Sequence, residues 1–380
     1  MRRCLTINGG FLSQRVTGVQ RYGREIVAEL DRLLQDDRLK SSLSAKIIAS
    51  AGSELGPALR AIAFAQTAAG GGPLWHQFVL PFATQGVLLS LCNMGPLFAS
   101  NHIVCIHDLN IILAPESYGS AYRTYHRIMG PILARHAARV VTVSHFSARM
   151  LNDFGFRRLD QITVIPNGHE HVRRWQPHLS RHSATDPNRR PFIFVLGSRA
   201  RHKNVDILFS IAKEIDALGL DIFVAGASGK GFSTLEMDSV PSNVRMLGFV
   251  TDDDLAALYQ NALCFAFPSL TEGFGLPVLE ALAFGCPVVA SNAASLPEVC
   301  GDAALYADPK SPRDWLDQIK RLRAEPNLSQ ILRAEGPRQA MRFSWAKSAQ
   351  LYLDLIMLQA QPSEMAGLKI LSEAAAVKMP

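Results

Sequence analysis

Two glutamates, Glu272 and Glu280, have the type and spacing expected of a binding site for a hydroxyl-rich ligand. An apolar strand is predicted at residues 263–267 and ends at Pro268, and a helix is predicted to begin at Pro277. Glu272 therefore lies in the loop at the carboxyl end of the strand, and Glu280 lies in the first two turns of the helix. Two carboxylates beside one loop can accept hydrogen bonds from two hydroxyl-bearing groups, a sugar and a ribose.

The residues between the two glutamates also favour binding of an anion. Gly273 and Gly275 allow close approach to the backbone. The amides of Phe274, Gly275 and Leu276 open the helix without carbonyl partners inside it, so they can donate to ligand oxygens. Taken singly, either glutamate could be a solvated charge or a complement to the helix dipole. The whole string favours a binding site.

Apolar strands alternate with helices through both halves of the chain. In the first half, strands are predicted at residues 4–7, 46–49, 87–91, 103–106 and 140–143, with helices between them at 17–30 and 122–138. Residues 171–191 are polar, and the alternation then restarts with strands at 192–196, 221–225, 244–247, 263–267 and 287–291. This pattern predicts an α/β fold of two doubly wound, Rossmann-like domains that face each other across a cleft.

The same pattern gives the expected boundaries. We predict one domain at residues 1–175, a second at 190–344 with a helix at 204–218 among its elements, and a C-terminal helix and tail at 345–380 that packs back on the first domain.

Three other residues lie at predicted strand or helix ends. His107 directly follows the strand at 103–106, and Lys203 follows the strand that ends at Gly197. Gly18 stands at the start of the first long helix, where free amides point toward the loop. Since ligands of open parallel sheets bind beyond the carboxyl ends of the strands, His107 and Lys203 are expected at the rim of the cleft.

The string Pro268-Ser-Leu-Thr-Glu-Gly-Phe-Gly-Leu-Pro-Val-Leu-Glu280 resembles the Glu-x7-Glu motif of glycosyltransferase family four, a group of retaining enzymes with the GT-B fold. Other segments are similar to the family pattern, among them Val104–Leu109, Ile165–Gly168 and Gly197–Asn204. The chain as a whole is similar to the mannosyltransferase-like branch that builds polysaccharide and lipopolysaccharide.

The resemblance implies a role for each matching position. Glu272 would hold hydroxyls of the donor sugar, Lys203 the diphosphate, Glu280 the nucleotide ribose, and His107 would lie beside the sugar. The amides of Phe274, Gly275 and Leu276 would contact the sugar or diphosphate, and Gly18 would face the phosphates from the other domain. Residues 1–175 would bind the acceptor and residues 190–344 the nucleotide sugar.

Two alternatives stay open in the sequence. The family has an arginine shortly before the lysine, and both Arg199 and Arg201 qualify; Arg199 is favoured because it is nearer the strand end. Asp252-Asp253-Asp254 contains the Asp-x-Asp pattern that other glycosyltransferases use to bind a metal. Here it opens a predicted helix, where acidic residues cap the helix and offset its dipole, so the structural role is favoured and no metal site is expected.

The expected activity is retaining, metal-independent transfer of a hexose, such as mannose from GDP-mannose, to a glycan or polyprenyl-diphosphate-linked acceptor. A GDP- or UDP-linked sugar is the donor substrate, and no separate cofactor is expected. A nucleotide-sugar epimerase, a phosphorylase and a non-catalytic sugar-nucleotide-binding protein remain as alternatives.

Composition and charge set the remaining expectations. Residues 1–170 contain 17 Lys and Arg against 11 Asp and Glu, so the whole net charge of +6 falls in the first half. Nothing resembles a nucleic-acid-binding module. The six cysteines form no C-x-x-C pair, which suits a reducing compartment. We expect a cytoplasmic protein, and the basic half suits either a solvated surface or peripheral contact with the cytoplasmic face of the inner membrane.

Overall fold

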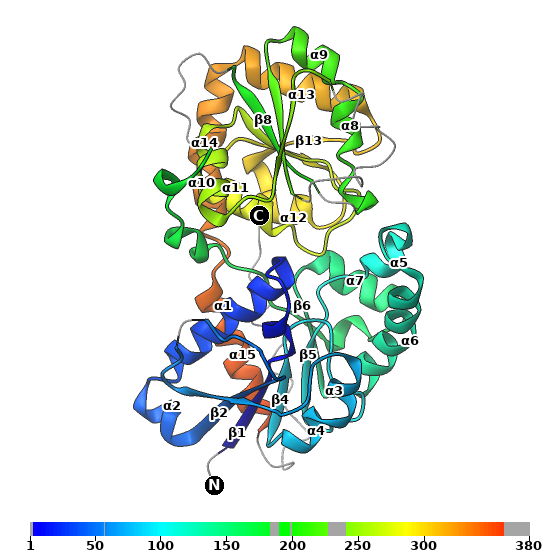
Figure 1. The fold of residues 1–380 in the computed structure, drawn as a ribbon, viewed down its shortest axis with the longest axis vertical. Helices are drawn as coiled ribbons and strands as arrows, with labels where there is room; N and C mark the ends of the chain where they lie inside the picture. Colours follow the sequence, from blue (N-terminus) through cyan, green and yellow to red (C-terminus); the bar gives the residue numbers. More distant parts are fainter. Residues whose placement is uncertain (1–2, 57, 183–189, 198–199, 227–240, 361–380) are drawn as a thin grey trace.

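Two parallel sheets organise the computed structural model, which describes residues 3–56, 58–182, 190–197, 200–226 and 241–360 (Figure 1). Among these residues, the first sheet has seven strands in the order β3-β2-β1-β4-β5-β6-β7. Its strands are β1 (Arg3–Asn8), β2 (Leu43–Ala49), β3 (Ile62–Gln66), β4 (Val87–Ser90), β5 (His102–Cys105), β6 (Arg139–Thr142) and β7 (Ile162–Val164). The helices connected to it are α1 (Gly18–Leu33), α2 (Asp37–Ser42), α3 (Pro73–Phe78), α4 (Leu80–Ala83), α5 (Asn110–Leu113), α6 (Ser120–His136) and α7 (His145–Asp153).

The second sheet repeats this plan with six strands, again counted over the described residues, in the order β10-β9-β8-β11-β12-β13. Its strands are β8 (Phe192–Gly197), β9 (Asp221–Gly226), β10 (Val244–Gly248), β11 (Cys264–Phe267), β12 (Val288–Ser291) and β13 (Ala304–Ala307). Its helices are α8 (Asp206–Phe209), α9 (Ala212–Ala217), α10 (Asp252–Asn261), α11 (Leu276–Ala283), α12 (Leu296–Cys300), α13 (Pro312–Ala324) and α14 (Pro326–Ala340). The predicted fold class, two doubly wound Rossmann-like domains, is confirmed.

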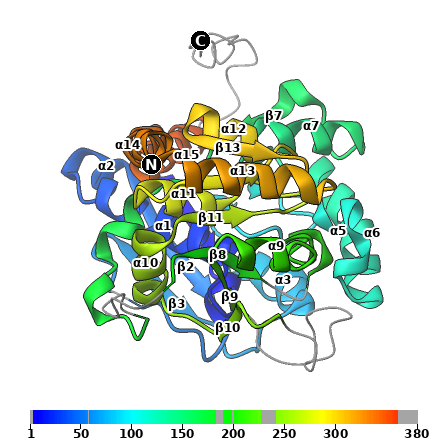
Figure 2. The same cartoon turned by 90° about the horizontal axis from the view of Figure 1, so that it is seen from above.

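Alternate side chains of each strand enter different cores because the two faces of each sheet are covered by different helices. In the second sheet, Phe194 packs on the side of α10 and α11, whereas Val195 packs with residues of α9 and α13 (Figure 2). In the first sheet, Ile47 shares a core with α1, whereas Ile48 shares one with α3 and α4. Strands buried on both faces explain the continuous apolar runs in the sequence.

The prediction of one continuous helix at residues 204–218 is wrong, because this segment is divided into α8 and α9. The hydroxyl of Ser210 donates to the carbonyl oxygen of Ile207 at 2.7 Å, which competes with a continuous helical ladder. The prediction that Gly18 stands at the start of the first long helix is confirmed, since α1 begins at Gly18 with Thr17 as its N-cap.

A last helix, α15 (Trp345–Gln359), returns from the second domain to the first and lies against α1 (Figure 1). The hydroxyls of Tyr22 on α1 and Tyr352 on α15 are 2.8 Å apart, and both side chains are fully buried. Glu170 fixes the start of α15 by accepting a hydrogen bond from the amide of Trp345 at 2.8 Å. The Ala-rich tail beyond residue 360 lies outside the described residues. No helix in the described part of the chain is long and apolar enough to cross a bilayer.

Gly168 is required where α15 begins. A Cβ at this position would lie 2.0 Å from the amide nitrogen of Trp345, so Gly168→Ala must displace backbone. We expect the substitution to lower the free energy of unfolding by about 2–3 kcal/mol, measured by urea denaturation. Gly70→Ala is the matched control, because a Cβ at this exposed loop position meets nothing within 4 Å, and it should change stability by less than about 0.5 kcal/mol. Equal urea midpoints for the two variants would contradict this assignment.

Candidate active site between the two domains

Lys203 and Glu272 meet at the switch point of the second sheet, where strand order reverses between β8 and β11. Lys203 ends the short 3-10 turn after β8, and Glu272 lies in the loop after β11. The Lys203 Nζ is 2.6 Å from the Glu272 Oε1, and the same ammonium lies 5.2 Å from the ring centre of Phe267. A crevice of this kind at the carboxyl ends of two diverging strands is where doubly wound sheets bind ligands.

The loop that carries Glu272 is held from behind. The hydroxyl of Ser295 donates to the Glu272 carbonyl oxygen at 3.0 Å, which fixes the backbone beside the carboxylate. Gly275 has a φ of +95° just before α11 begins at Leu276. This left-handed conformation explains the glycine, because a side chain there is strained and its Cβ would lie 2.6 Å from Leu296. The helix therefore begins one residue earlier than predicted, with Pro277 as its second residue.

The first domain contacts this loop directly. The Ser144 hydroxyl donates to the Gly273 carbonyl oxygen at 2.6 Å, and the Ser147 hydroxyl donates to the His107 carbonyl oxygen at 2.9 Å. A Cβ on Gly273 would lie 2.4 Å from the His107 carbonyl oxygen. The Glu272 loop and the residues after β5 are therefore in van der Waals contact across the domain boundary.

The imidazole of His107 is held in one tautomer. Its Nε2 lies 2.7 Å from the Leu91 carbonyl oxygen, which can only accept, so Nε2 carries the proton and Nδ1 is an acceptor. Burial lowers the pKa of His107 to about 4, partly offset by the Leu91 hydrogen bond. The ring also packs edge-on against Tyr22, with centres 4.7 Å apart. His107 is thus a neutral hydrogen-bond acceptor near pH 7.

Glu280 accepts the last hydrogen bond of a buried chain, called here the relay, that runs from Trp345 through His171. The sequence predicted Glu280 but neither of these two partners. The indole nitrogen of Trp345 donates to the Nδ1 of His171 at 3.0 Å, and the His171 Nε2 donates to the Glu280 Oε1 at 2.9 Å. Because an indole only donates, the proton of neutral His171 must be on Nε2. Arg21 of α1 approaches the same carboxylate oxygen at 3.8 Å. His171 lies in the polar segment between the two sheets, where no local pattern distinguishes it from its neighbours.

All three aspartates of the Asp-x-Asp segment have structural partners. Asp252 forms a two-pronged ion pair with Arg21 at 2.6 and 3.0 Å, and Asp253 accepts from the amide of Gln176 at 2.7 Å. Burial alone raises the pKa of Asp254, but hydrogen bonds from the Thr251 and Arg181 amides hold it well below its ordinary value. Across the described ranges, no group of three or more His, Cys, Asp and Glu side chains is placed to hold a metal.

The remaining predicted residues lie at or near the same boundary. Phe274 and Leu276 are buried, and Gly18 opens α1 with no atom within 4 Å of a Cβ built on it. Arg201 is exposed in the 3-10 turn that contains Lys203. Arg199 lies outside the described residues, so the choice between the two arginines stays open.

A pocket of about 390 Å³ lies in the first domain beside these residues. Its wall includes the start of α1, the loop after β4, and aromatic side chains ahead of and along α6. Asp108, next to His107, also lines it, and burial raises the pKa of that carboxyl, with Glu272 raising it further and Lys203 lowering it. The pocket therefore adjoins the Lys203–Glu272 pair from the opposite domain.

Two doubly wound domains whose strand ends face one another define the GT-B architecture. Over 94% of this chain and 100% of the other, the fold matches sucrose-phosphate synthase from Thermosynechococcus elongatus, with a TM-score of 0.73 and 18% identity. It also matches WaaG, described as a glycosyltransferase involved in lipopolysaccharide biosynthesis, with a TM-score of 0.65 and 14% identity over 93% of this chain and 99% of that one.

Residues 179–339 match the family model described as glycosyl transferases group 1. The chain is 48% identical over 102 residues to O-antigen chain mannosyltransferase B of Escherichia coli, which is 27% of each chain. It is 23% identical over 231 residues to O-antigen chain mannosyltransferase RfbU of Salmonella typhimurium, covering 60% of this chain and 62% of the relative. Each alignment thus spans less than two thirds of the relative. The segment 179–339 thus matches the group 1 glycosyltransferases, and the predicted resemblance to family four and its mannosyltransferase-like branch is confirmed.

The low pKa of His107 gives a pH prediction for stability. The unfolded chain binds this proton near pH 6.5, whereas the folded protein does not until about pH 4, so acidification over that interval favours unfolding. His107 alone should lower the free energy of unfolding by about 1.4 kcal/mol per pH unit there. Urea titrations between about pH 7 and about pH 4.5 measure the slope. His107→Gln should make it shallower, exposed His145→Gln serves as the control, and an unchanged slope in His107→Gln would refute the assignment.

Proposed function

We propose that this protein is a retaining glycosyltransferase that moves a hexose, mannose from GDP-mannose, to a glycan or polyprenyl-diphosphate-linked acceptor during polysaccharide or lipopolysaccharide biosynthesis. The observation that carries the proposal is the Lys203–Glu272 pair at the switch point of the second sheet, in contact with the His107 segment of the first domain. The relatives named as O-antigen mannosyltransferases support the choice of sugar and pathway class.

In this proposal, Lys203 and the amino ends of α11 and α1 together stabilise the leaving group. The departing nucleoside diphosphate gains negative charge as the glycosidic bond breaks, and a fixed ammonium stabilises that charge. Amides at Phe274, Gly275 and Leu276 add donors at the amino end of α11, and Gly18 offers the amino end of α1 from the opposite domain. Because Glu272 is 2.6 Å from Lys203, a donor whose diphosphate contacts Lys203 presents its sugar hydroxyls to Glu272.

Glu280 is assigned to the ribose. His171 and Arg21 both approach its Oε1, and no hydrogen bond from the described part of the chain reaches its Oε2, so this oxygen can accept from a ribose hydroxyl. The relay from Trp345 through His171 holds the carboxylate in place before the nucleotide arrives. Such positioning by buried partners reduces the entropy lost on binding.

His107 supplies a neutral acceptor beside the sugar. Its Nε2 is bound to the Leu91 carbonyl oxygen, so only Nδ1 can face a substrate hydroxyl. The adjoining 390 Å³ pocket, which Asp108 and the aromatic side chains Tyr118 and Tyr122 line, suits the acceptor glycan because aromatic faces pack well on sugar rings. Anomeric retention and independence from metal complete the proposal.

The pair of charges gives the central test. Lys203→Gln and Glu272→Gln should each lower kcat/KM for nucleotide release from the donor by about 100-fold or more. Because the two side chains contact each other, the double variant should lose less than the product of the single losses. A panel of GDP-, UDP- and ADP-sugars identifies the donor, and proton NMR of the product reads its anomeric configuration.

Lys310→Gln and Glu325→Gln, which remove exposed charges of the same domain, are matched controls and should retain activity. Wild-type turnover in the Lys203 variant would reject the site. Free sugar released without an acceptor would favour an epimerase instead. Tight binding without turnover on any acceptor would favour a sugar-nucleotide-binding protein.

The structural use of Asp252 and its two neighbours gives a test for metal. Asp252, Asp253 and Asp254 are engaged by protein partners, so we expect turnover with saturating EDTA to stay within about twofold of the untreated rate. The measurement is nucleotide release before and after chelation. Activity that falls to background on chelation and returns with Mn²⁺ would show that metal takes part.

A further inference from the structure

Large apolar side chains are exposed on one side of the first domain. In α3, α4 and the loop after β4, the exposed fractions are 72% for Leu74, 66% for Phe78, 89% for Phe82 and 80% for Phe98. Single exposed apolar residues are common on protein surfaces, but four within 25 positions form a cluster, and such a cluster indicates an interaction surface. On α6, Ile128 is also 57% exposed.

These elements form one continuous surface. Ile48 and Leu88 pack under α3 and α4, while Val104 and Val140 pack with residues of α6, and all four point to the same side of the first sheet. The Gln77 amide group joins α3 to the loop after β4, donating to the Gly95 carbonyl at 3.1 Å and accepting from the Leu97 amide at 3.1 Å.

The ring of Phe98 in that loop lies 5.1 Å from the ring of His136 on α6. Figure 1 shows α3, α4 and α6 on one side of the lower domain. We call this surface, made by Leu74, Phe78, Phe82, Phe98 and Ile128, the apolar face.

The elements that form the apolar face, α3, α4, the loop after β4 and α6, contain arginines and no acids. Residues 61–107 contain no Asp, Glu, Lys or Arg, and residues 117–152 contain five arginines and no acid. Three of these arginines, Arg123, Arg127 and Arg135, are on α6. The structure pairs Arg123 and Arg135 with backbone carbonyls, so neither charge is neutralised by those contacts.

We propose that the apolar face docks this protein on the surface of an anionic phospholipid bilayer. Phenylalanine and leucine side chains enter the boundary between headgroups and acyl chains, and flanking arginines are attracted to lipid phosphates. One feature favours an anionic bilayer over a protein partner: α3, α4, the loop after β4 and α6 contain arginines and no acids.

The 390 Å³ pocket lies beside the apolar face, so docking on a bilayer would bring the pocket close to a lipid-linked acceptor. This step rests on the proposed transfer to such an acceptor. Tyr122, His126 and Gly130 recur every four residues along α6 and line the 390 Å³ pocket. Tyr122 is also 53% exposed, so it belongs both to the pocket wall and to the outer surface beside the apolar face. A saccharide on a lipid anchor could therefore enter the pocket while its lipid stays in the bilayer.

Vesicle flotation with the full chain tests the proposal. Wild-type protein should float with vesicles of phosphatidylethanolamine and phosphatidylglycerol and much less with phosphatidylcholine. Phe78→Ser combined with Phe82→Ser should weaken partitioning by about tenfold or more. Arg127→Glu should weaken it by about fivefold or more on anionic vesicles, and added salt should reduce the difference.

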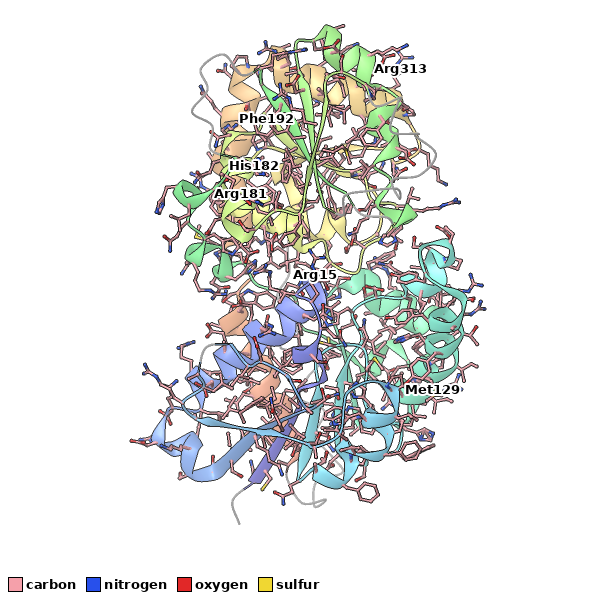
Figure 3. The ribbon with its side chains drawn as sticks, viewed as in Figure 1. Arg15, Met129, Arg181, His182, Phe192 and Arg313 are labelled. Carbon is pink, nitrogen blue, oxygen red and sulfur yellow. The ribbon has the colours of Figure 1, made fainter. Side chains whose placement is uncertain are left out.

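Matched controls come from the second domain. Ile331→Ser combined with Met341→Ser removes two apolar side chains of similar exposure, 58% each. Arg313→Glu reverses an exposed arginine on α13, toward the opposite end of the molecule from Met129 on α6 (Figure 3). All controls should float like wild type, and circular dichroism should verify folding of every variant.

Three outcomes would overturn the proposal: absence of wild-type flotation, equal loss in the control and apolar-face variants, or concentration-dependent self-association abolished by Phe78→Ser with Phe82→Ser. Nucleotide release with a water-soluble acceptor separates this proposal from the proposed function. The apolar-face variants should keep that activity. If wild type floats but transfers no sugar to any acceptor, docking stands and the proposed transfer fails.

Discussion

The contact between Gly273 and the backbone of His107 constrains the whole arrangement of the two domains. A single Cβ on Gly273 would lie 2.4 Å from the His107 carbonyl oxygen, so the loop with Glu272 reaches the other domain only because this position has no side chain. Ser144 and Ser147 then tie both backbones together at the start of α7. The carboxylate and the imidazole are brought to one place by this backbone contact, rather than by any attraction between themselves.

Two further connections keep that contact in register. Arg21 of α1 reaches across to Asp252 and Glu280, and α15 returns from the second domain to pack on α1. Trp345, the first residue of α15, also belongs to the relay that holds Glu280. The element that joins the domains is therefore the element that positions a predicted ligand group, so displacement of α15 would disturb both.

The fold class could be predicted because strands buried on both faces leave continuous apolar runs, as at Phe192–Gly197. Strand β3 (Ile62–Gln66) escaped prediction because it is an edge strand with only Ile62 buried, and β7 (Ile162–Val164) because three residues carry no clear period. The helices α13 and α14 were not predicted either, although α13 has Pro312 and a Ser311 cap at its start. Ser311 and Pro312 are the sequence signal that predicts the start of α13.

Site residues could be predicted where chemistry depends on a local string and could not where it depends on the approach of distant segments. Glu272, Lys203 and His107 lie in segments that follow predicted strands, and Glu280 lies on the predicted helix after the Glu272 loop. Arg21 and His171 contact Glu280 from 259 and 109 positions away, so no spacing rule relates them to it.

The aspartates of α10 illustrate the reverse difficulty, because an Asp-x-Asp string has the same letters whether it binds metal or anchors a neighbouring domain. What decides between these uses is the number of donors that reach each carboxylate. Asp254 alone receives hydrogen bonds from two amides and the Ser180 hydroxyl, while Asp252 is occupied by a guanidinium from the other domain. A carboxylate satisfied in this way gains little from a cation and would lose its partners by turning toward one. In the proposed reaction, the charge that offsets the departing diphosphate is therefore assigned to Lys203, to the arginine that precedes it and to the helix ends, which meet at the crevice between β8 and β11.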